Sequence, residues 1–86
     1  MSTGTLAKDR IRSFVLENFP LARARGVKDG DELLESGIVD SLGILDLVAF
    51  LESEFALHIQ DDDLMPENFR SIESIVKFTE QKSHSA

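Results

Sequence analysis

The chain contains no cysteine among its 86 residues, so a disulfide framework, a thiolate metal site and a cysteine nucleophile are all excluded. No apolar stretch approaches the roughly 20 residues needed to span a bilayer. The first residues, Met1 to Thr5, lack the basic and apolar regions of a secretory signal. We therefore expect a protein of the cytoplasm without a membrane span, in which any thiol chemistry comes from a cofactor.

Basic residues are missing from the middle of the chain. The span from Asp29 to Glu67 holds twelve Asp or Glu residues and no Lys or Arg, whereas residues 1–28 hold six basic and two acidic side chains. The formal net charge is −7. Nucleic-acid binding needs the opposite sign to neutralise phosphates, so that partner class is disfavoured. An acidic surface of this kind favours basic patches on partner proteins.

The length allows one small domain over residues 1–86, with a folded core at about residues 5–82 and flexible ends. A hydrophobic content of 42% is enough for a compact core, and the charged fraction of 29% is ordinary for a globular protein. We expect a folded monomer.

Apolar residues recur at helical spacing in several segments, and no alternating strand pattern is present. The predicted helices are Thr5–Asn18, which Pro20 ends, Ser41 to about Phe55, a brief acidic turn from Asp61 to Met65 that Pro66 bounds, and a last helix from the cap Ser71 to about Gln81. The interval from Leu21 to Asp40 has no sustained period. The fold class is all-α: an irregular three-to-four-helix bundle with a long loop between helices one and two.

The helix predicted from Ser41 carries more apolar surface than one core face requires. Its core face consists of Ile44, Leu47, Val48, Leu51 and Phe55. A second line on an adjacent face consists of Leu42, Leu45 and Ala49, interleaved with acidic residues. This second line is either covered by the long loop or offered to a partner.

Ser41 follows Asp40 where the irregular acidic stretch becomes helical. A serine at a helix start can cap the helix, or it can carry a covalent phosphate group near the free N–H groups and the positive end of the helix dipole. Asp40 can likewise be a surface carboxylate that interacts favourably with the positive end of the helix dipole. Both readings of each residue stay open from local sequence alone.

Over about residues 6–81 the chain resembles an acyl carrier protein, the helical domain that carries acyl groups as thioesters on phosphopantetheine. The resemblance depends on Asp40-Ser41-Leu42 at the helix start, on the downstream run from Leu47 to Phe55, and on Ile59 before the acidic turn. It implies that Ser41 receives 4′-phosphopantetheine from coenzyme A, and that Asp40 assists the transferase, by positioning its magnesium ion.

The resemblance also implies a docking surface and a set of partners. The matching docking positions are Leu42, Leu45, Asp46, Ala49, Glu52 and Asp61. The implied partners are a phosphopantetheinyl transferase, an acyl- or aminoacyl-activating ligase or acyltransferase, and downstream biosynthetic enzymes with basic patches. The chain itself is then a modified substrate of these enzymes and has no catalytic residues.

Two departures bear on the cargo. Housekeeping fatty-acid carriers place Gly two residues before the Asp and Asp two residues after the Ser, whereas this chain has Ile38 and Gly43 there. With the stretch from Asp63 to Phe69, the pattern is more similar to freestanding carriers of specialised pathways, including D-alanyl carriers. Fatty-acid or polyketide synthesis and other specialised pathways all remain open.

Three other functions can be compared with the residues present. A serine hydrolase needs a base, an oxyanion hole and a Gly-x-Ser-x-Gly elbow, and that motif is missing. The cluster Asp61-Asp62-Asp63 lacks the glycine and distal glutamate of a calcium loop, and His58 and His84 belong to no metal-spaced group, so no metal site is expected. An unmodified helical interaction module remains the alternative.

Overall fold

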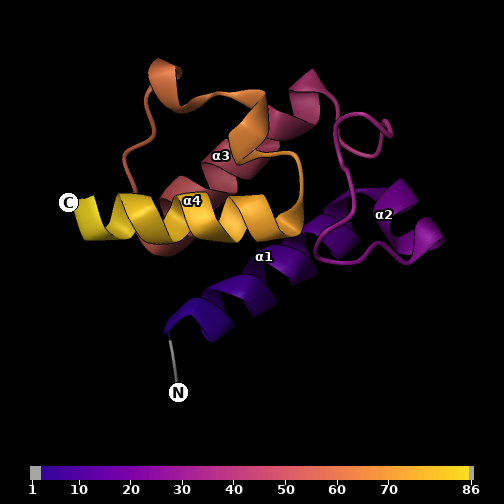
Figure 1. The fold of residues 1–86 in the computed structure, drawn as a ribbon, viewed down its shortest axis with the longest axis horizontal. Helices are drawn as coiled ribbons and strands as arrows, with labels where there is room; N and C mark the ends of the chain where they lie inside the picture. Colours follow the sequence, from indigo (N-terminus) through magenta and orange to yellow (C-terminus); the bar gives the residue numbers. More distant parts are fainter. Residues whose placement is uncertain (1–2, 86) are drawn as a thin grey trace.

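A computed structural model of the chain describes the backbone of residues 3–85 and the side chains of residues 7–83, so Ala86 and the side chain of His84 lie outside it. The elements, in chain order, are the α-helices α1 (Thr3–Asn18), α2 (Pro20–Arg25) and α3 (Ser41–Phe55), the 3₁₀ turns η1 (Asp61–Asp63) and η2 (Pro66–Asn68), and α4 (Ile72–Ser85). Over the described residues the fold is all-helical and contains no strand, as predicted (Figure 1).

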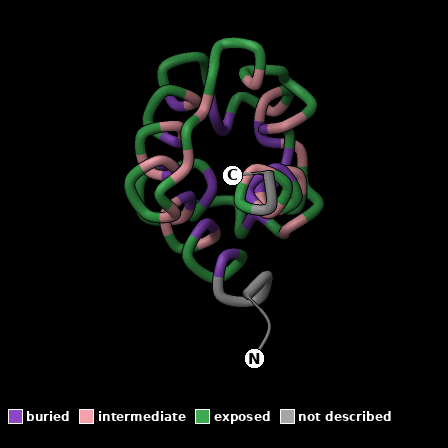
Figure 2. The backbone as a smooth tube through the Cα atoms, turned by 90° about the vertical axis from the view of Figure 1, so that its left-hand side faces the viewer, coloured by how far each residue is buried: buried purple, intermediate pink, exposed green. Residues whose placement is uncertain are grey.

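The core lies between α1, α3 and α4. Helix α1 packs against α2 and α4, and α3 packs against α4. The side chains with no exposed surface come from each of these helices and from the loops that join them: Ile11, Val15, Ala22, Leu33, Leu47, Leu51, Phe69, Ile72 and Ile75. Figure 2 shows the buried parts of the chain turned toward the middle of the molecule and the exposed parts turned outward. The predicted core face of α3 is confirmed, centred on Leu47 and Leu51.

The interval after α1 differs from the prediction, because Pro20 begins a helix instead of only ending one. Phe19 is extended, with φ −121° and ψ 98°, and Pro20 opens α2 at a position where its missing N–H costs nothing. Gly26 closes α2 in the left-handed region at φ 58°. Val27 then returns to the core with 1% exposure. The predicted long loop therefore contains a short helix that periodicity does not reveal.

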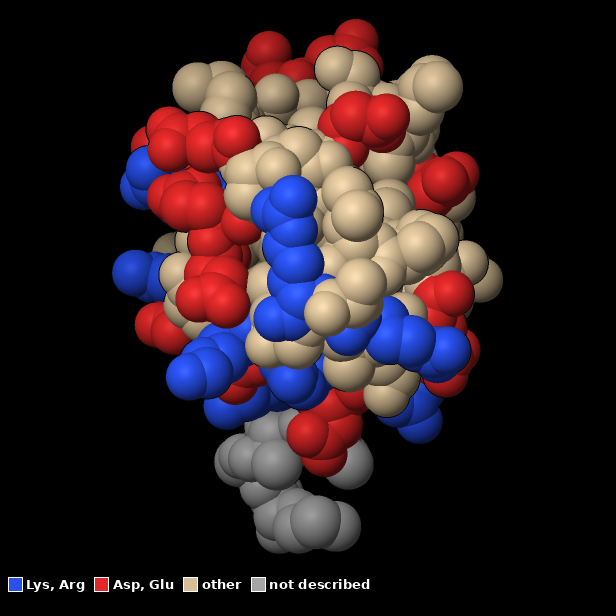
Figure 3. All heavy atoms as spheres, turned by 90° about the vertical axis from the view of Figure 1, so that its right-hand side faces the viewer, with Lys and Arg blue, Asp and Glu red and all other residues tan. Residues whose placement is uncertain are grey.

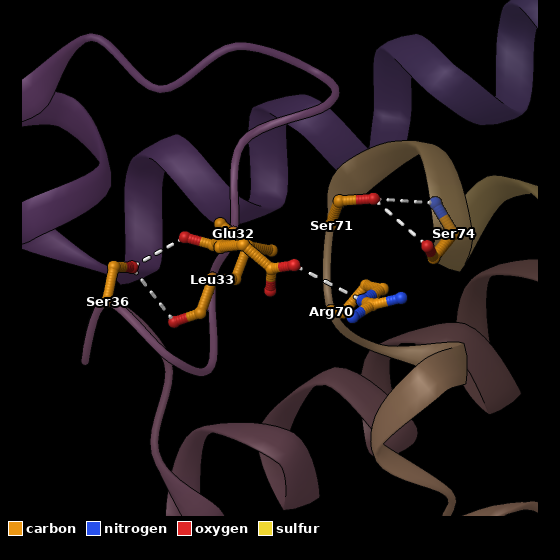
Figure 4. Close-up of polar contacts among 6 residues, drawn as sticks. All are labelled: Glu32, Leu33, Ser36, Arg70, Ser71 and Ser74. Carbon is orange, nitrogen blue, oxygen red and sulfur yellow. Dashed lines mark hydrogen bonds and ion pairs between the residues drawn. The ribbon is translucent and has the colours of Figure 1, made fainter.

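The rest of the interval is tied to the segment before α4. The Leu33 N–H donates to the Arg70 carbonyl at 2.7 Å, and the Arg70 Nε pairs with the Glu32 carboxylate at 3.3 Å. Ser36 donates its hydroxyl back to the Glu32 carbonyl at 2.5 Å (Figure 4). These bonds fix the chain only a few residues ahead of α3, so they hold the start of α3 in place.

The acidic segment after α3 forms two 3₁₀ turns, not one brief helical turn. Pro66 begins the second turn, so the expectation that it bounds a single turn is wrong. Asp63 holds the first turn by accepting the Gln60 N–H at 3.0 Å, and it pairs with Lys82 at 2.8 Å. The Lys82 hydrogen bond is the main reason why the pKa of Asp63 lies below its ordinary value.

Helix α4 begins where predicted and ends later. Ser71 accepts the Ser74 N–H at 3.1 Å, which confirms Ser71 as the cap (Figure 4). The helix continues to Ser85 instead of ending near Gln81. The pair between Lys82 and Asp63 ties the added turn to η1, so Lys82 belongs to the ordered part of the chain.

Candidate functional site

The start of α3 is built by Asp40. Its backbone is extended, at φ −104° and ψ −172°, and its carboxylate accepts the Gly43 N–H at 2.8 Å, while its carbonyl accepts the Ile44 N–H at 3.0 Å. Asp40 is therefore the N-cap and Ser41 is the first residue inside the helix. The reading of Ser41 as the helix cap is wrong, because the residue before it does that work.

The Ser41 hydroxyl is available for covalent modification. Ser41 is exposed, and its hydroxyl makes no hydrogen bond to any described residue. The backbone N–H groups of Ser41 and Leu42 also have no acceptor in the described part of the chain, since the cap takes the next two N–H groups. A phosphate ester on Ser41 fits here, because two free donors and the positive end of the α3 dipole face its negative charge.

The packing around Gly43 leaves no room for a side chain at this position. A β-carbon at Gly43 would lie 2.6 Å from the Phe19 ring and 3.0 Å from the Val39 side chain, and both of these residues are buried. The start of α3 therefore packs directly on the residue that precedes α2. The sequence does not predict this contact, because Phe19 and Gly43 are far apart in the chain and no local pattern around either residue indicates that they pack together.

The predicted second apolar line of α3 is exposed. Leu42 shows 73% and Leu45 57% of its surface, and Ala49 is exposed as well. The alternative that the long loop covers this line is wrong. The structure also leaves Asp46 exposed on the same helix and Asp61 exposed at the start of η1. Leucines with carboxylates beside them are suited to a partner that combines apolar and basic groups.

Glu52 differs from the other predicted docking residues. It is half-buried, and its carboxylate accepts the Ile59 N–H at 3.1 Å. This bond ties α3 to the segment that leads into η1. A substitution of Glu52 would therefore disturb local structure as well as surface charge, and Asp46 is the cleaner test of docking.

The structure shows no metal-binding cluster in the part of the chain that it describes. These residues contain no group of three or more His, Cys, Asp or Glu side chains placed to hold a metal ion. His58 is exposed in the segment after α3. None of the described helices is both long enough and apolar enough to cross a bilayer.

Comparison with known proteins gives one informative similarity. No protein-family model matches the chain. A curated protein of Serratia sp. (strain ATCC 39006), named "Probable acyl carrier protein PigG", is 39% identical over 64 residues. The match covers 69% of this chain and 74% of that protein.

Proposed function

This chain belongs to the acyl carrier protein family, and from that premise we propose that it carries acyl or aminoacyl groups on a 4′-phosphopantetheine arm attached to Ser41. A member of this family is a carrier on which biosynthetic enzymes act, and it is not itself an enzyme. The observation that best supports Ser41 as the attachment point is its free, exposed hydroxyl at the positive end of α3, beside a cap supplied by Asp40.

Each part of the site has a chemical role in this proposal. The Ser41 oxygen bonds the pantetheine-side phosphorus of coenzyme A and loses its proton, and adenosine 3′,5′-bisphosphate leaves. The N–H groups of Ser41 and Leu42 favour the phosphodiester that results. When bound, the arm supplies a thiol that holds cargo as a thioester, which this cysteine-free chain cannot supply itself. Asp40 has a second role, toward the magnesium ion of the transferase.

The two roles of Asp40 are separable by substitution. Asp40→Asn keeps a capping oxygen, so we expect the free energy of unfolding to change by less than about 0.5 kcal/mol, whereas Asp40→Ala should lower it by about 0.5–2 kcal/mol. Both variants lose the carboxylate charge, so both should be loaded by the transferase at least about 10-fold more slowly. Urea unfolding and a timed mass assay measure the two effects. A normal loading rate for Asp40→Asn would limit Asp40 to capping.

We propose that partners dock on the exposed line of α3. The surface consists of Leu42, Leu45, Asp46 and Ala49, with Asp61 at its far end and Glu52 in a mainly structural position. Carboxylates steer basic partners over distance, and the leucines fix orientation at short range. The partners are the transferase, a ligase or acyltransferase that loads the cargo, and downstream enzymes, all in the cytoplasm. Ile38 and Gly43 stand where housekeeping fatty-acid carriers have Gly and Asp, and this difference favours a specialised pathway over fatty-acid synthesis.

Charge reversal at Asp46 tests docking. Asp46→Lys should slow association with the transferase by about 3- to 10-fold at low salt, and the effect should shrink as salt rises, because exposed charges are screened. Glu17→Lys makes the same charge change on α1, where Glu17 is exposed, and serves as the matched control. Stopped-flow binding over a salt series measures both. Equal rates for the two variants would remove Asp46 from the interface.

The proposed function as a whole is tested by loading. We expect the chain to gain one phosphopantetheine group when it is incubated with coenzyme A, magnesium and a broad-specificity transferase. The alternative, an unmodified interaction module, predicts a folded protein of unchanged mass.

A further inference from the structure

The Lys and Arg residues of this acidic protein fall into two groups, those that form ion pairs within the described part of the chain and those that do not. Five of the nine Lys and Arg residues form ion pairs with carboxylates of the chain: Lys8, Arg10, Arg12, Arg70 and Lys82. The Asp29 carboxylate joins Lys8 at 2.9 Å and Arg12 at 3.1 Å, and chiefly for this reason the pKa of Asp29 lies below its ordinary value. The charge of each of these cations is therefore matched by a carboxylate of the same chain.

Four cations have no carboxylate partner among the described residues, and three of them cluster. Arg23, Arg25 and Lys28 lie on α2 and just after it, whereas Lys77 stands alone on α4. All four are exposed. Arg25 donates a hydrogen bond to a backbone carbonyl, that of Ser36, at 3.3 Å. The cluster also includes an exposed leucine, because Leu21 shows 44% of its surface.

Figure 3 faces the α2 end of the molecule and shows Lys and Arg side chains gathered across its lower half, with acidic side chains above and beside them. The simpler explanation is that the positive charges of Arg23 and Arg25 interact favourably with the negative, C-terminal end of the α2 dipole. That effect falls off within one helical turn and does not explain Lys28 or the exposed leucine. A basic surface that includes an exposed leucine is suited to an acidic protein surface.

The position of α2 indicates which protein approaches it. Phe19, which precedes α2, packs on Gly43, two residues after Ser41, and Arg25 bonds the Ser36 carbonyl in the loop that leads to Asp40. These two contacts join α2 to the chain on either side of Asp40 and Ser41, so the edge of α2 is the neighbouring surface that an enzyme bound over Ser41 would reach. Extended polyanions are poor candidates, because a net charge of −7 repels nucleic acids and anionic membranes.

We propose that the α2 surface, defined by Leu21, Arg23, Arg25 and Lys28, is a second docking surface that binds carboxylates of the transferase acting on Ser41. This inference rests on the proposed function. The carrier then presents a negative surface along α3 and a positive one on α2, with Ser41 near their boundary. Opposite charges on the two sides fix the rotation of the carrier about Ser41, which one acidic surface alone leaves free.

The test compares charge reversals in loading assays with coenzyme A, magnesium and a purified broad-specificity transferase. The double variant R23E/R25E should lower kcat/KM by about 5- to 30-fold at low salt, mainly through KM, and less as salt rises. Lys77→Glu makes a reversal on α4, and should change kcat/KM by less than about 2-fold. Lys28→Glu removes a side chain without a described partner, so it tests the surface without risk to the fold.

The outcomes separate this inference from the proposed function. If the wild-type chain is loaded and R23E/R25E and Lys28→Glu are loaded at wild-type rates, the α2 surface is overturned and Ser41 loading stands. An equal loss for Lys77→Glu would show a general charge effect and would also overturn it, as would salt-dependent self-association that R23E/R25E abolishes while loading is unchanged. Failure of the folded wild-type chain to load would overturn both proposals.

Discussion

Replacement of Ser41 by alanine should abolish loading by the transferase and leave the fold intact. The hydroxyl is the proposed attachment point, and no other side chain at the start of α3 offers an oxygen of the same kind. Because Asp40 supplies the cap and the Ser41 hydroxyl makes no hydrogen bond within the described residues, the substitution should change the free energy of unfolding by less than about 0.5 kcal/mol. Intact mass after incubation and urea unfolding measure the two effects.

A matched control is available on the same helix. Ser53 is also exposed on α3 but lies away from its N-terminus, so Ser53→Ala should be loaded like the wild-type chain. Complete loading of Ser41→Ala would move the attachment site to another residue. A large loss of stability in Ser41→Ala would mean that Ser41 has a structural role that the cap at Asp40 does not explain.

The second large effect is expected at Gly43. Gly43→Asp introduces the residue that housekeeping carriers have at this position, and it should lower the free energy of unfolding by about 3 kcal/mol. A β-carbon there would lie 2.6 Å from the buried Phe19 ring, so the ring or the helix must shift. An acidic residue near a helix N-terminus contributes about 0.3–1 kcal/mol, which is too little to offset that overlap. Urea unfolding checks the value.

Two further variants identify the cause of the effect at Gly43. Gly30→Ala is the control, because a β-carbon there would be 3.7 Å from the Glu73 carboxylate, an ordinary contact, and it should cost less than about 0.5 kcal/mol. In a Phe19→Ala background the additional cost of Gly43→Asp should fall by more than about 1 kcal/mol, since the obstructing ring is gone. Strictly additive costs would contradict the contact as the cause.

The elements that the sequence predicts well have a strong local signal. Helix α3 runs from Ser41 to Phe55 as its apolar periodicity predicts, and the exposed second line was visible as surplus apolar residues. Helix α2 was missed, because six residues are too few for a period, although Pro20 and Gly26 mark its two ends. Helix α4 extends to Ser85 past its last apolar residue, where polar residues carry no periodic signal.

The sequence predicts that Ser41 lies at a helix start, and α3 does begin there. Aspartate and serine are equally good caps, so their adjacency in the sequence does not show which of the two caps α3. The contact between Phe19 and Gly43 and the half-buried position of Glu52 depend on how separate elements pack. The unpaired state of the α2 cations likewise becomes visible only when the ion pairs of the other cations are known.

The measurement that tests the central claim most directly is the mass of the wild-type chain after incubation with coenzyme A, magnesium and a broad-specificity phosphopantetheinyl transferase, followed by mapping of the modified peptide. The account predicts one phosphopantetheine group per chain, located on Ser41. A folded chain that gains no mass, or that carries the group on another residue, would contradict it.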